Sequence, residues 1–364
     1  MKNPFICISV TDRTEYLSSR GSLNRAVLKK LPLYGIEDGI EGLTFKDIFS
    51  TPSFVAAIRH ECARLGVDTG DLPDYMLPHF ADEALSSPKV RDRQMAERVV
   101  KRFGNRLGLL LLALKTGERE NREARGDWDD ACWEYWAKLD TVILTGGLAS
   151  SMLGRRFKEY IHAIFDAAHV KPYQIMLFDN GTYIGVMGVA QRLMPDDTAS
   201  LVLDFGHTGI KRAVVKKAFG EIAEFTPQDS LPSLHMKSRF DSEEEKRREA
   251  IALHRYIVNT ITSSYREGLI SGPLSGTVLI SIANYTHNGV LNSERGGYAK
   301  LCEIGADYAR VLEDDLSGEL HRDIKVRLVH DSTASALYFS DIDNAACITL
   351  GTGFGVGFTD IHIQ

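Results

Sequence analysis

The chain has 364 residues, of which 44% are hydrophobic and 25% charged, and its formal net charge is −6 at pH 7. This composition is typical of a globular protein and excludes disordered, collagen-like and coiled-coil classes for the whole chain. The acidic balance argues against a broad nucleic-acid-binding surface. Because single cores stop growing at about 250–300 residues, two domains are predicted.

The five cysteines are scattered along the chain and form no C-x-x-C pair, so neither a disulfide framework nor a thiolate zinc site is predicted. The start of the chain lacks the long apolar stretch and the cleavage site of a signal peptide. The longest apolar run, Leu109 to Leu114, is far too short to span a bilayer. We therefore expect a soluble, cytoplasmic protein with neither a membrane nor a nucleic acid as partner.

In chain order, the apolar residues 5–10 predict a short strand, and residues 45–66 predict a helix. Residues 68–87 combine two prolines with polar clusters, so an irregular connection is expected there.

The clearest helix follows, because apolar residues recur at helical spacing from Ala96 to Leu114. Gly104 and Gly108 lie inside this helix and weaken it, which indicates a close approach of another element. The charged and aromatic segment 115–136 is expected to lie mostly on the surface.

Residues 140–144 predict a strand, and Gly146-Gly147 follows it before the next helix. The small and apolar residues 183–193 predict a tightly packed helix. The sequence Met194-Pro195-Asp196-Asp197 interrupts that pattern and is the expected domain boundary.

Beyond residue 197, short turns separate three predicted strands at 200–205, 210–215 and 221–225, which favours an antiparallel meander. The elements expected after it are a long helix over 242–268, a strand over 278–282, a helix over 298–311, a strand over 326–329, a short helix over 332–338, and strands over 346–350 and 356–360.

Two segments, residues 201–215 and 347–361, share one pattern of apolar strand, glycine turn and second strand. Glycine permits a positive φ and lets a ligand approach without a Cβ in the way. Such turns expose N–H groups and threonine hydroxyls that suit phosphate oxygens. Either segment alone is better explained by an ordinary tight hairpin.

The two hairpins, together with Gly146-Gly147 and Asp331 after their strands, resemble the signature motifs of the actin-like sugar kinases. The closest resemblance is to the repressor/ORF/kinase (ROK) group with the bacterial glucokinases. The matching residues are Asp204-Phe205-Gly206-His207-Thr208 with Lys211 for the first phosphate motif, Gly351-Thr352-Gly353 for the second, Gly146-Gly147 for the adenosine motif, and Asp331 with its small followers for the catalytic-base motif.

The order of these motifs is rearranged, because the adenosine motif comes first in this chain and near the C-terminus in the family. The resemblance therefore implies a circularly permuted α/β fold of two ribonuclease H-like (actin-like ATPase) domains around a central cleft. The large nucleotide-binding domain is expected at residues 1–180 plus 344–364, and the small domain at 181–343. The last strand, ending near Ile363, would then neighbour residues 5–10.

The resemblance also implies roles for individual residues. Asp204 is expected to hold Mg²⁺ through water, and Gly206, Thr208 and Lys211 to bind phosphates. Asp331 would accept the proton of the attacking hydroxyl. Asp331 before a small-residue helix is otherwise a favoured N-cap, so both roles stay open.

The adenosine and second phosphate motifs complete the expected nucleotide site. Gly146 and Gly147 would let the purine lie against the backbone, although a plain strand-to-helix turn explains them as well. Gly351, Thr352 and Gly353 would bind phosphates of ATP.

The chain departs from the family where the acceptor would bind. His207 replaces a glycine and His330 an asparagine, and the zinc motif and sugar clamp of the family are absent. By position we nominate Asn284, His287 and His330 as acceptor contacts. Weaker candidates are the carboxylates Glu37, Asp38 and Glu41.

The resemblance implies an ATP- and Mg²⁺-dependent kinase that acts on a sugar or related polyol, and it is compatible with a homodimer. A catalytically weak nucleotide- or sugar-binding regulator on the same fold is the alternative, favoured by His207, His330 and the missing clamp. No helix-turn-helix extension is visible that would indicate a DNA-binding repressor.

Overall fold

The computed structural model describes residues 2–9, 14–178, 181–193, 198–294 and 296–361. The chain divides into two compact units, each built from separate segments: unit 1 comprises Met1–Phe5, Arg20–Gly181 and Ile342–Asp360, and unit 2 comprises Ile6–Ser19, Thr182–Asp341 and Ile361–Gln364. Residues 6–19, expected in the large domain, thus belong to unit 2. The expected boundary at Met194-Pro195-Asp196-Asp197 and the strand end near Ile363 lie outside the described residues.

Unit 2 is organised around a five-stranded sheet with the order β11-β8-β5-β6-β7. The first three strands in chain order pair antiparallel, as the short turns predicted, and β8 and β11 then add in parallel on the other side of β5. The strands are β5 (Ala199–Phe205), β6 (Gly209–Ala218), β7 (Glu221–Pro232), β8 (Leu274–Ile282) and β11 (Lys325–His330). This order and these directions are those of a ribonuclease H-like domain.

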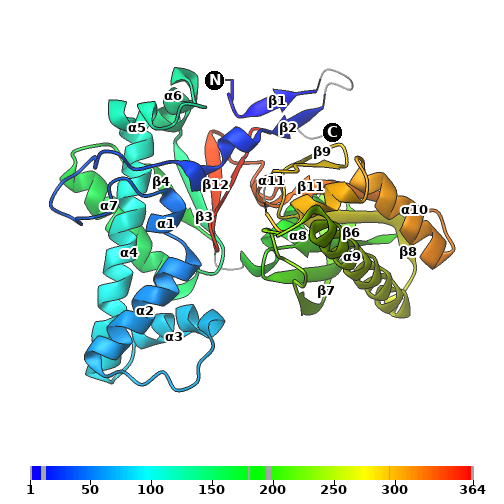
Figure 1. Ribbon diagram of the computed structural model, residues 1–364, viewed down its shortest axis with the longest axis horizontal. Helices are drawn as coiled ribbons and strands as arrows, with labels where there is room; N and C mark the ends of the chain where they lie inside the picture. The colour runs from blue at the N-terminus through cyan, green and yellow to red at the C-terminus, as the bar shows by residue number, and fades with distance from the viewer. Residues whose placement is uncertain (1, 10–13, 179–180, 194–197, 295, 362–364) are drawn as a thin grey trace. The chain divides into compact units, whose positions relative to one another are not determined.

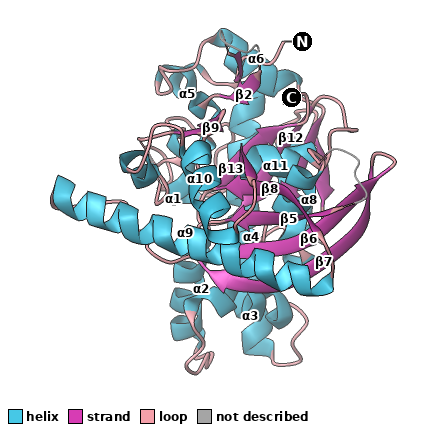
Figure 2. Ribbon diagram, turned by 90° about the vertical axis from the view of Figure 1, so that its right-hand side faces the viewer, coloured by secondary structure: helices cyan, strands magenta, loops and turns pink. Residues whose placement is uncertain are grey.

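The long helix α9 (Glu243–Ser271) lies across one face of this sheet (Figure 2). Its buried residues, among them Leu253, Ile257 and Ile261, join one apolar cluster with the sheet and with α10 (Tyr308–Leu320). On the N-terminal side, Ser242 caps α9 by accepting a hydrogen bond from the Glu245 N–H.

Two short helices of unit 2, α8 (Ile184–Ala190) and α11 (Asp331–Leu337), pack against each other. A Cβ at Gly188 would lie 1.7 Å from the Ala334 carbonyl oxygen, so only glycine permits this contact. The small residues of both helices therefore serve the close packing that the sequence of residues 183–193 predicted.

A small hairpin, β1 (Ile6–Ile8) with β2 (Glu15–Leu17), also belongs to unit 2, as does the hairpin of β9 (Thr286–His287) with β10 (Val290–Leu291). Phe5 stacks on Phe358 of β13 (Phe354–Phe358) with ring centroids 5.3 Å apart, but β1 pairs antiparallel with β2 and does not supply a further strand beside β13.

Unit 1 contains a four-stranded sheet with the order β13-β12-β3-β4 (Figure 1). Its strands are β3 (Thr141–Thr145), β4 (Gln174–Leu177), β12 (Ala345–Leu350) and β13 (Phe354–Phe358). β12 and β13 form an antiparallel hairpin, and β3 and β4 follow in parallel. The arrangement repeats β6-β5-β8-β11 of unit 2, so both units share the ribonuclease H-like pattern.

The helices of unit 1 are α1 (Phe45–Ile48), α2 (Thr51–Leu65), α3 (Leu77–Ala84), α4 (Val90–Thr116), α5 (Arg119–Glu123), α6 (Asp130–Lys138) and α7 (Ser151–Ala167). The close approach predicted at Gly104 and Gly108 of α4 is confirmed. A Cβ at Gly104 would lie 2.7 Å from Tyr160 and one at Gly108 2.8 Å from Ile164, both on α7.

One expectation for unit 1 is wrong. Residues 68–87 are not wholly irregular, because α3 begins at Leu77 with Pro78 in its first turn, where a missing N–H is tolerated. Most residues of the segment 115–136 are exposed or half-buried, as expected, but its aromatic residues are buried: Trp128, Trp133, Tyr135 and Trp136. No described helix is long and apolar enough to cross a membrane.

Candidate active site

The carboxyl ends of the parallel strands of unit 2 meet at one edge of the sheet. Asp204 near the end of β5 lies beside Ser281 of β8, and β11 ends at His330 immediately before Asp331. Because ligands of open α/β sheets bind at this edge, the polar side chains that gather here form the candidate active site.

Asp204 is buried, with both carboxylate oxygens engaged. Ser281 donates a hydrogen bond to Oδ1 at 2.8 Å, and the Nζ of Lys211, opposite Asp204 on β6, lies 3.6 Å from Oδ2. Gly185 of α8 leaves room for the carboxylate, since a Cβ there would lie 2.8 Å from its carbon.

The environment of Asp204 disfavours its charge. Burial raises the pKa of Asp204, and the nearby carboxylate of Asp331 raises it further, while Lys211 and the Ser281 hydrogen bond oppose the shift. Two mutually repelling carboxylates beside a lysine are the electrostatic pattern of many functional sites.

Hydrogen bonds to both backbone groups of Gly206 hold the turn after Asp204 in place. The Gly206 N–H donates to the Gly209 carbonyl at 3.1 Å, while Tyr298 and Ser233 donate to the Gly206 carbonyl at 2.9 and 2.8 Å. The side chains of His207 and Thr208 at the tip are exposed. Gly206 does not have a positive φ, so close approach is what favours glycine at this position.

Asp331 is the first residue of α11, and its side chain is 36% exposed. Its Oδ1 accepts hydrogen bonds from the N–H and the hydroxyl of Ser332 at 2.6 and 3.0 Å, and His330 Nε2 lies 3.2 Å from it. All of these contacts go to Oδ1, which leaves Oδ2 without a partner among the described residues.

The residue that caps α11 is His330 rather than Asp331. His330 Nδ1 accepts a hydrogen bond from the Thr333 N–H, which places the proton of a neutral ring on Nε2, facing Asp331. The ring stacks on Tyr285 with centroids 4.2 Å apart. Burial lowers the pKa of His330, although the Asp331 carboxylate opposes the shift.

In unit 1, Gly146 and the second glycine hairpin lie together at the carboxyl ends of β3 and β12. Gly146 has φ of 91°, and a Cβ there would lie 2.5 Å from the Leu350 carbonyl oxygen. Beneath it, the hydroxyls of Thr145 and Thr349 lie 2.9 Å apart. The positive φ expected of the glycines in the two hairpins, residues 201–215 and 347–361, is found in neither of them, whereas Gly146 has one.

The Gly351-Thr352-Gly353 loop is anchored from both sides. Thr51 at the start of α2 donates its N–H to the Gly351 carbonyl at 2.7 Å. The Asn24 side chain makes two hydrogen bonds to the backbone of Phe354, accepting from its N–H at 2.7 Å and donating to its carbonyl at 2.9 Å. A Cβ at Gly147 would meet nothing within 4 Å, and one at Gly351 only an atom 3.9 Å away, so the backbone at both positions is open.

The acceptor candidates separate in the structure. Asn284 is buried, and its side-chain amide makes two hydrogen bonds to the backbone of Asn292. It accepts from the Asn292 N–H at 2.9 Å and donates to the Asn292 carbonyl at 3.1 Å, which closes the loop. His287 stacks on Tyr16 with centroids 4.2 Å apart, and it lines the same cavity as His330.

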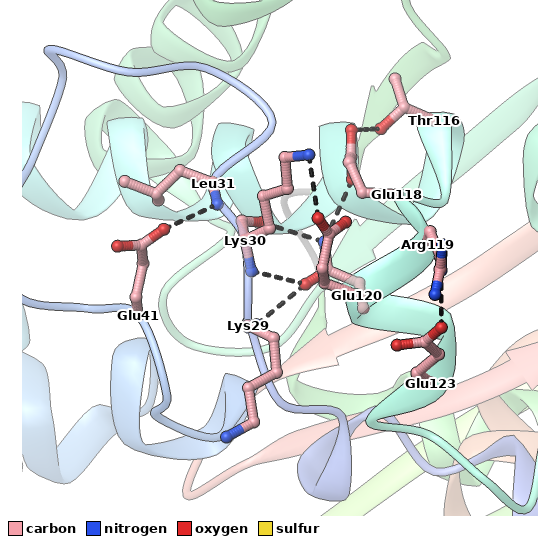
Figure 3. Close-up of polar contacts among 10 residues, drawn as sticks. Lys29, Lys30, Leu31, Glu41, Thr116, Glu118, Arg119, Glu120 and Glu123 are labelled. Atoms are coloured by element: carbon pink, nitrogen blue, oxygen red, sulfur yellow. Dashed lines mark hydrogen bonds and ion pairs between the residues drawn. The ribbon is translucent and has the colours of Figure 1, made fainter.

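The carboxylates of Glu37 and Glu41 have structural partners in unit 1, and no contact of the Asp38 carboxylate is seen among the described residues. Burial alone would raise the pKa of Glu37, but hydrogen bonds from Arg106 and Arg102 outweigh it and lower the pKa. Glu41 accepts from the Leu31 N–H at 3.2 Å, in the loop that Asn121 also holds (Figure 3). These contacts fix the loop, which gives both carboxylates a structural role.

Three residues of the site escaped the sequence analysis: Ser281, Tyr298 and Gly185. Ser281 precedes a strand end in the same way as Asp204, so the strand-end rule that singled out Asp204 would also have found it. Tyr298 and Gly185 act through contacts between elements distant in sequence, for which a single sequence carries no signal.

No three His, Cys, Asp or Glu side chains form a metal cluster within the described ranges. Asp204 and Asp331 are instead oxygen donors at one sheet edge. That set fits Mg²⁺, which is commonly bound by one or two carboxylates together with substrate phosphates and water.

No family model matches the chain, and no curated protein matches it significantly. Among solved structures, it resembles the ethanolamine utilization protein EutJ from Carboxydothermus hydrogenoformans, with 14% identity over 64% of this chain and 75% of that one, at a TM-score of 0.32. The type II variant of the Aquifex aeolicus Ppx/GppA phosphatase has 12% identity over 64% and 82%, also at 0.32. An exopolyphosphatase-like protein has 8% identity over 72% and 86%, at 0.30. Likenesses this distant carry no conclusion about the activity of this chain.

Proposed function

We propose that the protein is an ATP-dependent phosphotransferase that acts on a hydroxyl group of a sugar or related polyol. One observation carries the proposal: a buried Asp204, neutralised by Lys211, interacts electrostatically with Asp331 at the strand ends of unit 2. Phosphoryl transfer relies mainly on positioning and charge neutralisation, and these residues supply both.

In this proposal Asp204 holds Mg²⁺, which would neutralise charge on the phosphates. Lys211 pairs with Asp204 through a 3.6 Å contact and adds a cation beside Gly206. The Gly206–Gly209 turn would present backbone N–H groups and Thr208 to phosphate oxygens.

Asp331 acts as the general base in the proposed reaction. Its Oδ2 takes the proton of the acceptor hydroxyl while the acceptor oxygen forms a bond to the γ-phosphorus and the bond to the ADP oxygen breaks. Oδ1 is already committed to Ser332 and His330, so the side chain is held in place for Oδ2 to act.

Unit 1 takes the remaining nucleotide contacts in the proposal. Gly146 and Gly147 would receive the adenosine, and Gly351, Thr352 and Gly353 the phosphates. The support is that both motifs lie at the carboxyl ends of β3 and β12 with open backbone.

We also propose that the chain is circularly permuted relative to the actin-like sugar kinases. The support is the chain order of the unit 1 sheet: β3 and β4 come from the first half of the sequence, and the β12–β13 hairpin from its end. In unit 2 the equivalent hairpin, β5–β6, precedes β8 and β11.

An assay of ADP release tests the proposal, with ATP, Mg²⁺ and a panel of hexoses, amino sugars, N-acetylated sugars and polyols. We expect acceptor-dependent turnover that Asp331→Asn reduces by about 10³-fold or more, within the range for general-base catalysis and positioning. The matched control is Asp323→Asn, an exposed aspartate in the same unit whose loss should leave turnover unchanged.

Absence of turnover with every acceptor, combined with nucleotide or sugar binding by calorimetry, contradicts the kinase proposal and favours the regulator. Absence of nucleotide binding contradicts both.

A further inference from the structure

A cavity of about 510 Å³ lies within unit 2, away from the nucleotide residues proposed above. Its walls are consecutive residues of β11 from Val326 to His330, β2 from Glu15 to Leu17, the turn from Thr286 to Gly289, and the start of α10. Its volume is in the range of small-molecule sites, about 300–1,000 Å³. Of the residues nominated above for the proposed reaction, only the acceptor candidates His287 and His330 line this cavity.

The guanidinium groups of two arginines in the cavity wall have no hydrogen bond or ion pair among the described residues. They belong to Arg192, which follows α8, and Arg327 of β11. Burial lowers the pKa of Arg192, and the charge of Arg327 lowers it further. The two guanidinium groups therefore lie close enough to repel each other.

The acidic residues in the wall do not neutralise these arginines, because they are engaged elsewhere. Asp307 caps α10 by accepting from the Arg310 N–H at 3.1 Å. Glu313 accepts from the Val326 N–H at 3.0 Å and pairs with Arg310. Glu15 also has a partner.

Rings and polar groups also line the cavity. The rings of His287 and Tyr16 lie with centroids 4.2 Å apart, and the His330 ring adjoins Asp331. Thr286 contributes a hydroxyl that has no partner among the described residues. These groups suit a hydroxyl-bearing ring, while the arginines suit an anionic group.

We propose that this cavity binds a small organic anion, a sugar-sized molecule that carries a phosphate or carboxylate group. Arg192 and Arg327 hold the anionic group, and His287, Tyr16 and Thr286 contact the body of the ligand. The binding requires neither ATP nor Asp331, so it can be tested separately from the proposed reaction. Because the ligand touches His330, whose Nε2 lies 3.2 Å from Asp331 Oδ1, its occupancy also reaches the proposed catalytic residue.

Isothermal calorimetry on the full chain without nucleotide tests the site, using inorganic phosphate, a hexose 6-phosphate, a hexuronate and the uncharged hexose as probes. We expect a charged sugar to bind at least about tenfold more tightly than the uncharged hexose. Tighter binding of the hexose phosphate or of the hexuronate identifies the anionic group. Arg192→Gln and Arg327→Gln should each weaken that binding about tenfold or more.

Arg247→Gln is the matched control, because Arg247 is exposed on α9 of the same unit and does not line the cavity. Since Arg192 and Arg327 lack partners and repel each other, their glutamine variants should unfold at the same temperature as the parent or higher. Failure of every anionic probe to bind at about 10 mM, or equal binding by parent and both variants, overturns the proposal. Failure of the kinase assay alone leaves it intact.

Discussion

Asp204 lies inside the sheet with Ser281 and Lys211 as partners, whereas Asp331 stands at the strand end with one oxygen uncommitted. A buried carboxylate that repels its neighbour is costly to keep charged, and such strain is common at functional sites. Single-residue variants can therefore separate function from stability.

Replacing Asp204 with asparagine should stabilise the fold at neutral pH. The folded-state pKa of Asp204 is raised, so its burial costs stability above that pKa, and the cost disappears as pH falls toward the unfolded value. We expect Asp204→Asn to raise the melting temperature at pH 8, by an amount that shrinks on acidification, while abolishing Mg²⁺-dependent turnover. Calorimetric melting at several pH values measures this, and a lower melting temperature at pH 8 would contradict it.

His330 can be tested through its capping role. Asparagine is a favoured N-cap, so His330→Asn should retain the start of α11, whereas His330→Ala should cost about 1 kcal/mol. Urea unfolding of the two variants gives the comparison. Equal loss of stability in both would show that the stack on Tyr285, rather than the cap, is the contribution of this residue.

The sequence correctly predicted the position of some candidate residues at the ends of strands, while their roles stay predictions. Asp204, Gly146 and Asp331 were located because strand ends are readable from apolar runs. From the sequence, Asp331 could be either a general base or the N-cap of the following helix. In the structure the N-cap of α11 is His330, because the backbone turn at the end of β11 decides which residue occupies that position. The partners of Asn284 likewise follow from a loop closure that spacing does not encode.

At the scale of elements, close helix packing positions α8 and α11. Gly188 rests on the Ala334 carbonyl, and Gly185 of the same helix rests on Asp204. Backbone atoms cannot rotate away as a side chain can, so the contact has little tolerance. Glycine spacing in residues 183–193 predicted the tight packing but not the partner.

Adding one methyl group at Gly188 should therefore be costly. Gly188→Ala would place Cβ 1.7 Å from a backbone oxygen, and we expect a loss of about 1–3 kcal/mol or more from overpacking. The matched control is Gly318→Ala in α10, where nothing lies within 4 Å of the added Cβ. There the higher helix propensity of alanine should raise the free energy of unfolding by about 1 kcal/mol. Denaturant unfolding followed by circular dichroism measures both, and a neutral Gly188→Ala contradicts the packing.

The failures at this scale concern which partner an element chooses. The apolar pattern of residues 5–10 correctly indicated a strand, but β1 pairs with β2 and not with the unit 1 sheet. In α6 the charges that suggested a surface lie on one face, and Trp133 and Trp136 on the other are buried. Helix and strand periodicity report local structure, whereas pairing is decided by tertiary packing.

At the scale of the whole molecule, the two units have separate cores and repeat the same strand pattern. The three tryptophans of the chain, Trp128, Trp133 and Trp136, all lie buried in unit 1. Tryptophan fluorescence therefore follows the unfolding of unit 1, and far-ultraviolet circular dichroism follows both units.

A variant in each unit tests whether the cores unfold separately. Glu37→Gln in unit 1 should cost about 2 kcal/mol of charge-assisted hydrogen bonding and lower the fluorescence midpoint. This cost should fade in acid, because the lowered pKa of Glu37 contributes stability above the unfolded value that is lost as pH falls through the folded one. Gly188→Ala in unit 2 should shift the dichroism while the fluorescence midpoint stays unchanged. One common transition moved equally by both variants would contradict separate unfolding.

The most direct measurement of the proposed activity follows the γ-phosphoryl group of labelled ATP with Mg²⁺ and the acceptor panel. A phosphotransferase predicts that the label appears on a sugar or polyol and that Asp331→Asn abolishes the transfer, with little release to water. Label that remains on ATP, or that reaches only inorganic phosphate whatever the acceptor, would contradict the assignment of Asp331 as the base of a kinase.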